Sequence, residues 1–387
     1  MKIDEMLIRE DFYGILLTTL NAHFSQINSQ IAITSSRYKD SNVLHTYDKL
    51  NAIISKDPSK EVRAFLKTEY SVEGTLFRKL LVTAYLSAAL HTRGLLSNKF
   101  KLYSKGFNKN DINHILIYPC NKKIRVFNFK TNEIDVVTKA GFPNDAIKKE
   151  IEFRTRHKSL HIEPVIDYGD NWYRERIIDG TPLARINNSS EEYIYFKKES
   201  LDILISITES YKTAINASDY IKDIIRKIKS ISEPIINHVP SIQNTLEQIE
   251  TILVGNLSGF DTGIPLTLSH GDFHHGNIWL EKINNNIIII DWETSNMRSE
   301  WYDVVTLFGG LRETIGIDSL LKKILSGENH ELSNLLGEKD FSKKIFLVLL
   351  EDLLFRADDL KATPLEIGCV EFDIYCKMLL HNLKINN

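Results

Sequence analysis

Runs of strand-forming residues, separated by polar turn-like segments, are the feature of this chain that most restricts its fold. β-Branched and aromatic residues in runs of this length are typical of β-strands. The first three runs are His114–Tyr118, Ile124–Phe129 and Ile134–Lys139. A helical stretch follows near residues 144–157, and further strands are expected at Pro164–Tyr168 and Trp172–Ile178. The pattern predicts a small five-stranded antiparallel sheet that carries one helix.

Apolar residues at helical spacing dominate both sides of this segment. Ile221, Ile224 and Ile228 mark one apolar helix face, and Pro234 is expected to end that helix because proline lacks an N–H. We therefore expect an α+β fold with a helical N-terminal extension over residues 1–100. A sheet-rich lobe over residues 101–180 and a mainly helical lobe over residues 181–387 would follow.

Composition excludes several functional classes. The formal charge of −3 gives no strong field, so no nucleic-acid partner is indicated. Cys120, Cys369 and Cys376 form no metal-ligand pattern, and we expect a cytoplasmic protein with reduced thiols. The apolar stretch Leu80–Leu90 is too short for a transmembrane segment and is expected to be a buried helix. The N-terminal helices remain candidates for contact with a partner or a membrane surface.

The most informative segment is SHGDFHHGNIWLE, with NNIIIIDWE shortly after it. Asp272 and Asn277 lie in a loop between apolar strands, and a run of isoleucines ends at Asp291. Hard oxygen ligands that converge at the ends of buried strands suit Mg²⁺, which binds few protein groups. Taken singly, each of these residues is a common turn former. Their joint order and spacing favour a catalytic site.

The order H-x-D-x-x-x-x-N followed by a metal-binding Asp is the kinase arrangement. In the form HGDFHHGN…IDWE, it resembles the signature of aminoglycoside phosphotransferases, choline kinases and related small-molecule kinases. Protein kinases normally carry HRD and DFG at these places. The resemblance is strongest at residues 269–305, and residues 1–100 lie outside it. It implies a bilobal protein kinase-like fold.

The resemblance also implies roles for individual residues. Asp272 would be the catalytic base that accepts the proton of the attacking hydroxyl, and His270 would brace the loop. Asn277 and Asp291 would hold Mg²⁺ against the phosphates of ATP or GTP. Asp303 would brace the loop from the next segment. The neighbouring His274 and His275 are not expected to bind a metal.

The sheet-rich lobe would supply the nucleotide site. Lys139 would hold the α- and β-phosphates, and Glu150, with Glu152 as the second choice, would hold Lys139. Glu175 and Ile177 would belong to the hinge whose backbone pairs with the purine.

The phosphate-covering loop departs from the family pattern. Its place falls at Pro119–Lys123, which contains no glycine. Lys122 or Lys123 is a candidate for direct phosphate contact. If Gly106 marks the loop instead, the order of the strands shifts by one strand.

The acceptor is the least defined part. Glu351 and Asp352 lie on a C-terminal helix that would present carboxylates to a cationic substrate. The alternative for both is a solvated helix face. The acceptor is expected to be a small molecule or a sugar. A glycan or lipid-linked saccharide kinase, an atypical protein kinase and a nucleotide-binding pseudokinase scaffold remain as alternatives.

Overall fold

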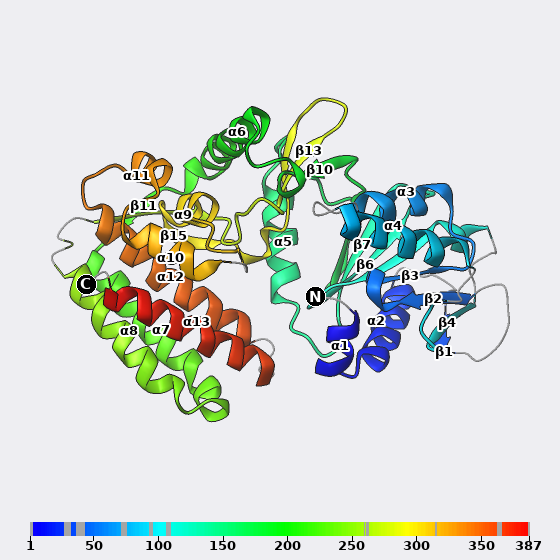
Figure 1. Ribbon diagram of the computed structural model, residues 1–387, viewed down its shortest axis with the longest axis horizontal. Coiled ribbons are helices and arrows are strands. Elements are labelled where there is room, and N and C mark those ends of the chain that lie inside the picture. Colours follow the sequence, from blue (N-terminus) through cyan, green and yellow to red (C-terminus); the bar gives the residue numbers. More distant parts are fainter. Residues whose placement is uncertain are drawn as a thin grey trace. The chain divides into compact units, whose positions relative to one another are not determined.

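The computed structural model divides into two compact units (Figure 1). The sheet unit comprises Met1–Thr155 and Glu163–Asp179, and the helical unit comprises Arg156–Ile162 and Gly180–Asn387. The residues described are 3–26, 32–35, 43–70, 76–92, 96–105, 110–258, 260, 263–313, 316–361 and 366–385. Gly106, the alternative position for the phosphate-covering loop, lies outside them.

The sheet unit is built around an antiparallel sheet. In the described residues this sheet has nine strands in the order β1-β4-β2-β3-β5-β6-β7-β9-β8. The strands are β1 (Ala32–Ser35), β2 (Val43–Tyr47), β3 (Ala52–Ser55), β4 (Lys101–Lys105), β5 (Ile115–Pro119), β6 (Lys123–Asn128), β7 (Glu133–Thr138), β8 (Asp167–Tyr168) and β9 (Trp172–Arg176). The five predicted strands are the contiguous block from β5 to β8, so they were correctly placed.

The N-terminal segment differs from the expectation of a purely helical extension. Its helices are α1 (Ile3–Arg9), α2 (Phe12–Gln26), α3 (Lys60–Glu69) and α4 (Leu76–His91), so the expected helical character is present. The same segment also contributes β1, β2 and β3, which extend the sheet through the pairing of β3 with β5. Residues 1–100 therefore belong to the sheet unit, and no division between units falls near residue 100 among the described residues.

The two faces of this sheet are covered by different helices. Leu16 and Leu20 of α2 pack in one apolar cluster with Ile124 and Val126 of β6. Leu66 of α3 and Leu90 of α4 lie in a second cluster with Ile151 of α5 (Asp145–Arg156) and Val136 of β7. Since side chains alternate along a strand, the two clusters lie on opposite faces of the sheet (Figure 1).

The stretch Leu80–Leu90 is helical but only partly buried. Leu86 and Leu90 lie in the core, whereas Leu80 is 65% exposed and Leu81 is 55% exposed. The expectation of a buried helix therefore holds for one side of α4, which covers the sheet, and not for the other. No helix in the described ranges is long and apolar enough to cross a membrane.

The helical unit contains two small sheets and a group of packed helices. In the described residues, one sheet has the order β10-β13-β14 and the other β11-β12-β15. The strands are β10 (Gly180–Pro182), β11 (Thr213–Ile215), β12 (Ile264–Ser269), β13 (Ile278–Glu281), β14 (Ile287–Ile289) and β15 (Asn296–Ser299). The helices are α6 (Glu191–Thr208), α7 (Ala217–His238), α8 (Ile242–Leu257), α9 (Tyr302–Gly309), α10 (Ile317–Leu325), α11 (His330–Leu336), α12 (Phe341–Lys361) and α13 (Glu366–Ile385). The predicted α+β class, with an antiparallel sheet, a helical C-terminal part and N-terminal helices, is confirmed.

Pro234 does not end its helix as expected. It lies inside α7, which continues to His238. Pro234 and Ser230 are both exposed, so water can bond the Ser230 carbonyl that loses its helical partner. Ile221, Ile224, Ile228 and Ile235 form the buried face of α7, which packs against α8 and α12.

Candidate active site

The candidate site lies where the chain crosses twice between the two small sheets of the helical unit. β12 pairs with β15 in one sheet, and β13 pairs with β14 in the other. Residues 270–277 run from β12 to β13, and residues 290–295 return from β14 to β15. Because both segments join the same two sheets, they lie side by side, which brings Asp272, Asn277 and Asp291 to one place.

Side-chain and backbone bonds tie the two crossing segments together. His270 Nε2 donates to the Ile290 carbonyl at 2.9 Å, and His270 Nδ1 accepts from the Asp272 backbone N–H at 3.3 Å. The Ile290 N–H donates to the Asn277 carbonyl at 3.0 Å. The Asn277 amide donates to the Asp272 carbonyl at 2.9 Å and to Asp272 Oδ2 at 3.3 Å. Burial lowers the pKa of His270, so the ring is neutral and braces the loop with both nitrogens.

Asp303 holds the start of the loop. Its carboxylate accepts from the Ser269 hydroxyl at 3.0 Å and from the backbone N–H groups of His270 at 2.8 Å and Gly271 at 3.1 Å. Gly271 has a φ of +88°, and a Cβ there would lie 2.5 Å from the Thr294 carbonyl oxygen. Only glycine fits this close approach, which explains the HGD form of the motif.

Asp291 occupies a strained position two residues after the end of β14. Its backbone is left-handed, with φ 68° and ψ 53°, which a residue other than glycine adopts at a cost of about 1–3 kcal/mol. Asp291 directly follows Ile290, whose backbone bonds both Asn277 and His270, so Asp291 lies next to these two residues in the chain's fold. The donor set of Asp291 carboxylate and Asn277 amide oxygen fits Mg²⁺.

Such an ion would need further ligands from outside the chain. Among the residues that the structure describes, no three His, Cys, Asp or Glu side chains gather as a metal site. Magnesium sites built from one or two protein oxygens are completed by water and by phosphate oxygens. His274 lies with Nε2 3.6 Å from Asp272 Oδ2, and His275 bonds the Tyr193 hydroxyl at 2.8 Å.

Arg312 is the site residue that the sequence analysis missed. Its Nε lies 3.1 Å from Asp272 Oδ1, and its Nη2 donates to the Gly271 carbonyl at 3.0 Å. Burial alone would raise the pKa of Asp272, but His274 and Arg312 outweigh burial and lower it. Asp272 is therefore held as a carboxylate. Arg312 follows α9, well past the motif, and no spacing rule marks it.

Glu351, predicted to contact the acceptor, is a structural residue. Its side chain is buried, with 3% of the residue exposed. It accepts from the Ser299 N–H at 2.7 Å, the Ser299 hydroxyl at 2.6 Å and the Tyr220 hydroxyl at 2.6 Å. Burial raises the pKa of Glu351, although the hydrogen bonds from Ser299 and Tyr220 lower it in part. Neither an acceptor contact nor a solvated helix face fits this arrangement.

Asp352 is fully buried and supports the site indirectly. It forms ion pairs with Arg312 Nη1 and, at 2.8 Å, with Arg356 Nε, and it accepts from the Tyr375 hydroxyl at 2.7 Å. Burial opposes ionisation, yet the two arginines hold the pKa of Asp352 well below its usual range. The predicted substrate ligand is thus the group that positions Arg312 against Asp272.

In the sheet unit, the predicted pair of Lys139 and Glu150 is not formed. Lys139 is buried, and its Nζ lies 2.5 Å from Glu10 Oε1 in the turn between α1 and α2. Glu150 instead lies 3.1 Å from Arg154 Nη1, which also pairs with Glu175 at 2.7 Å.

Strand alternation explains this result. Asp135 of β7 bonds His23 of α2 at 2.9 Å, so Asp135 and Lys139 point to the face that α1 and α2 cover. Val136 packs with Ile151 of α5 on the other face. Lys139 and Glu150 therefore lie on opposite faces of the sheet.

Lys123 is the lysine on the same face as Glu150. It begins β6, where Phe127 packs in the cluster that contains α5, and its side chain is 7% exposed. Burial raises the pKa of Tyr173, which the charge of Glu150 raises further and the charge of Lys123 lowers.

The predicted hinge is bonded within the sheet unit, because the Ile177 N–H donates to the Asn132 carbonyl at 3.0 Å.

The comparison with family models agrees with the site. Residues 239–323, which contain the catalytic-loop motif and Arg312, match the model described as the phosphotransferase enzyme family. This match confirms the resemblance drawn from the motif. The two crossing segments lie near the middle of the matched residues. No curated protein matches the sequence.

Solved kinase structures resemble the chain at low identity. An ethanolamine kinase from Plasmodium vivax is 12% identical, with a TM-score of 0.44, over 86% of this chain and 98% of that one. A choline kinase from Cryptosporidium parvum is 13% identical, with a TM-score of 0.44, over 72% and 91%. An aminoglycoside phosphotransferase of type 2″-IIa, bound to streptomycin and ATP, is 15% identical, with a TM-score of 0.40, over 68% and 93%.

The substitution Glu10→Gln tests the role of Lys139. Because it leaves the buried charge of Lys139 without a partner, we expect the free energy of unfolding to fall by about 3–5 kcal/mol. The double variant with Lys139→Met should recover most of this loss in urea denaturation. If Glu10→Gln instead tightens nucleotide binding, Glu10 masks a phosphate-binding lysine and the structural role is wrong.

The substitution Asp352→Asn tests the support of Arg312. We expect kcat to fall by about tenfold or more while the KM for nucleotide stays within about twofold, because a misplaced Arg312 no longer orients Asp272. Steady-state kinetics check this split, with Asp358→Asn on the same helix as the control. Equal kcat values in the two variants would show that Asp352 only stabilises α12.

Proposed function

We propose that this protein is a kinase that transfers the γ-phosphoryl group of ATP, or GTP, to a hydroxyl of a small molecule or sugar. The observation that carries the proposal is the bonded set of Asp272, Asn277 and His270 beside Asp291. The family match to residues 239–323 supports the same chemistry. The identity of the acceptor is to be determined by the assay described below.

Asp272 is the proposed acceptor of the proton. The acceptor hydroxyl oxygen attacks the γ-phosphorus, the bond from that phosphorus to the β,γ-bridging oxygen breaks, and the nucleoside diphosphate leaves. The hydroxyl proton passes to an Asp272 carboxylate oxygen. Arg312 and His274 keep this carboxylate ionised, and Asn277 fixes its orientation.

Asn277 and Asp291 are the proposed ligands of Mg²⁺. Both supply hard oxygen atoms, and the backbone bond between Ile290 and Asn277 holds them next to each other. When bound, the ion would neutralise charge on the phosphates.

The sheet unit is the proposed nucleotide-binding part, and Lys123 replaces Lys139 as the candidate phosphate ligand. Lys123 ends the Pro119–Lys123 turn and lies on the sheet face that carries Glu150. A lysine there holds nucleotide phosphates as a point charge, which suits a turn that lacks glycine. Lys139, paired with Glu10, is assigned to the stability of the unit.

The rival proposal is a kinase-like scaffold that lacks turnover. Two observations favour it. Lys139 is paired with Glu10, and the Ile177 N–H is bonded to the Asn132 carbonyl, so neither group is available for the nucleotide contact predicted for it. A nucleotide-consumption assay separates the two. It would use Mg²⁺ with ATP or GTP against aminoglycosides, choline analogues, nucleosides, and mono- and oligosaccharides. Acceptor-dependent release of nucleoside diphosphate supports the kinase, and none with any acceptor supports the scaffold.

The substitution Asp272→Asn is expected to lower kcat by about 10²–10⁴-fold while the affinity for nucleotide stays within about threefold. The matched variant Asp291→Asn should instead weaken nucleotide binding in a Mg²⁺ titration. Single-turnover kinetics and calorimetry measure the two effects. Full turnover by Asp272→Asn would remove the base from the mechanism, and unchanged Mg²⁺ dependence in Asp291→Asn would remove the metal ligand.

The substitution Lys123→Met is expected to raise the KM for nucleotide by about tenfold, since one charge-assisted contact to phosphate is lost. Lys122→Met, one position earlier in the same turn, is the matched control and should change KM by less than about twofold. Steady-state kinetics at saturating acceptor measure both. A larger effect at Lys122 would reverse the assignment.

A further inference from the structure

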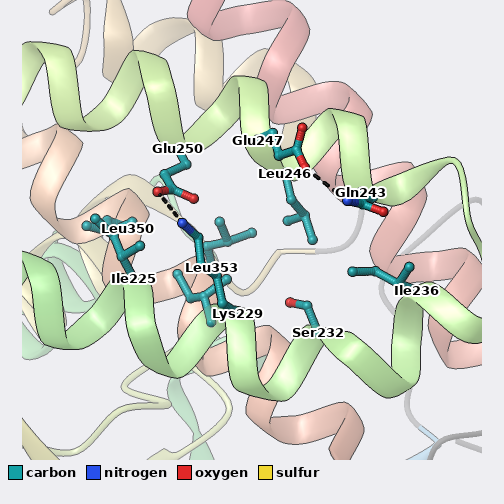
Figure 2. A pocket seen from close by; sticks show the side chains of 11 residues that line it. Ile225, Lys229, Ser232, Ile236, Gln243, Leu246, Glu247, Glu250, Leu350 and Leu353 are labelled. Atoms are coloured by element: carbon teal, nitrogen blue, oxygen red, sulfur yellow. Dashed lines mark hydrogen bonds and ion pairs between the residues drawn. The ribbon is translucent and has the colours of Figure 1, made fainter.

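A cavity lies between α7, α8 and α12 in the helical unit (Figure 2). Its volume is about 230 Å³. The wall is mainly aliphatic, and the apolar residues that line it are Ile225, Ile228, Ile236, Leu246, Leu350 and Leu353. The cavity is open to solvent on one side, since Lys229, Gln243 and Glu247 on its rim are exposed.

Ser232 is the polar group that points into this space. It projects from α7 toward α8 (Figure 2), and the residue is 2% exposed. Its hydroxyl has no hydrogen-bond partner. A helical serine usually bonds the carbonyl four residues earlier. A buried hydroxyl without a partner costs about 1–3 kcal/mol, which a bound molecule would recover by bonding it.

The charged residues at the rim are already engaged. Lys229 Nζ lies 2.9 Å from Glu250 Oε1, which joins α7 to α8 across one end of the cavity. Gln243 donates to Glu247 at 3.1 Å on the exposed side of α8. With these groups bonded to each other, the site does not select a charged ligand, and a neutral one avoids an uncompensated charge.

The cavity is separate from the candidate active site. Leu350 and Leu353 present one side of α12 to the cavity. The intervening Glu351 and Asp352 bond Ser299 and Arg312 instead. The helix therefore stands between the cavity and Asp272, and the cavity is not the place where an acceptor hydroxyl meets the base.

We propose that this cavity, lined by Ser232, Ile228, Leu246 and Leu353, is a second ligand site for a compact, neutral, fused-ring molecule with one N–H or O–H group. An apolar protein cavity of about 150 Å³ binds benzene, so 230 Å³ accommodates a two-ring skeleton. The single buried hydroxyl then receives the single polar group of the ligand. This assignment does not depend on phosphoryl transfer.

Indole and indene form a matched probe pair for the full-length protein, because they share a shape and only indole has an N–H. We expect both to bind with saturation in ligand-detected NMR titrations. Ser232→Ala should weaken indole binding by about fivefold, the value of one net hydrogen bond, and leave indene unchanged. Ser232→Leu, which fills the space, should abolish binding of both probes. Ser230→Ala and Ser230→Leu, at an exposed position on α7, should change neither.

Thermal unfolding provides a second readout. We expect Ser232→Leu to keep or raise the Tm because the added side chain enters the cavity. A lower Tm would mean that the side chain is overpacked and would contradict the cavity. Absence of saturable indole binding, equal binding to Ser232→Leu, or loss of folding in that variant would each overturn the proposal. All of these measurements are made without turnover, so they stand apart from the kinase assay.

Discussion

The candidate site depends on the double crossing between two small sheets. Pairing of β12 with β15 and of β13 with β14 obliges the two connecting segments to run together. His270 then joins them through the Ile290 carbonyl, and Asp303 fixes the loop through three donors at its start. Backbone pairing thus decides where Asp272, Asn277 and Asp291 meet. The side chains only refine that position.

A chain of ion pairs around the buried Asp352 extends this control into the helices. Asp272 is paired with Arg312, and Arg312 with Asp352, which also binds Arg356. Each carboxylate in the chain has a guanidinium partner, which offsets the desolvation that burial imposes. The crossing segment that carries Asp272 is therefore anchored to α12 by ion pairs, and Glu351 anchors β15 to the same helix through Ser299.

The sequence predicted what depends on local pattern. The five strands from β5 to β8 and the apolar face of α7 follow from residue pattern, and the clustering of Asp272 with Asn277 follows from the motif. It could not predict contacts that only the fold creates. β1 to β3 are short strands in a segment of helical character, and Arg312 reaches the loop through tertiary packing. Glu351 and Asp352 looked like surface charges because their partners are distant in sequence.

The case of Lys139 shows why strand register must be known before a residue's role is assigned. Its place at the end of a β-branched run suits a phosphate-binding lysine, yet a single step along a strand reverses the face to which a side chain points. Asp135 faces α2, and Lys139 faces Glu10 in the turn between α1 and α2. Lys123 of the neighbouring strand lies on the face that α5 covers. Composition and spacing are identical for either register. The face is set by how β6 and β7 pair, and the sequence segment alone does not contain that information.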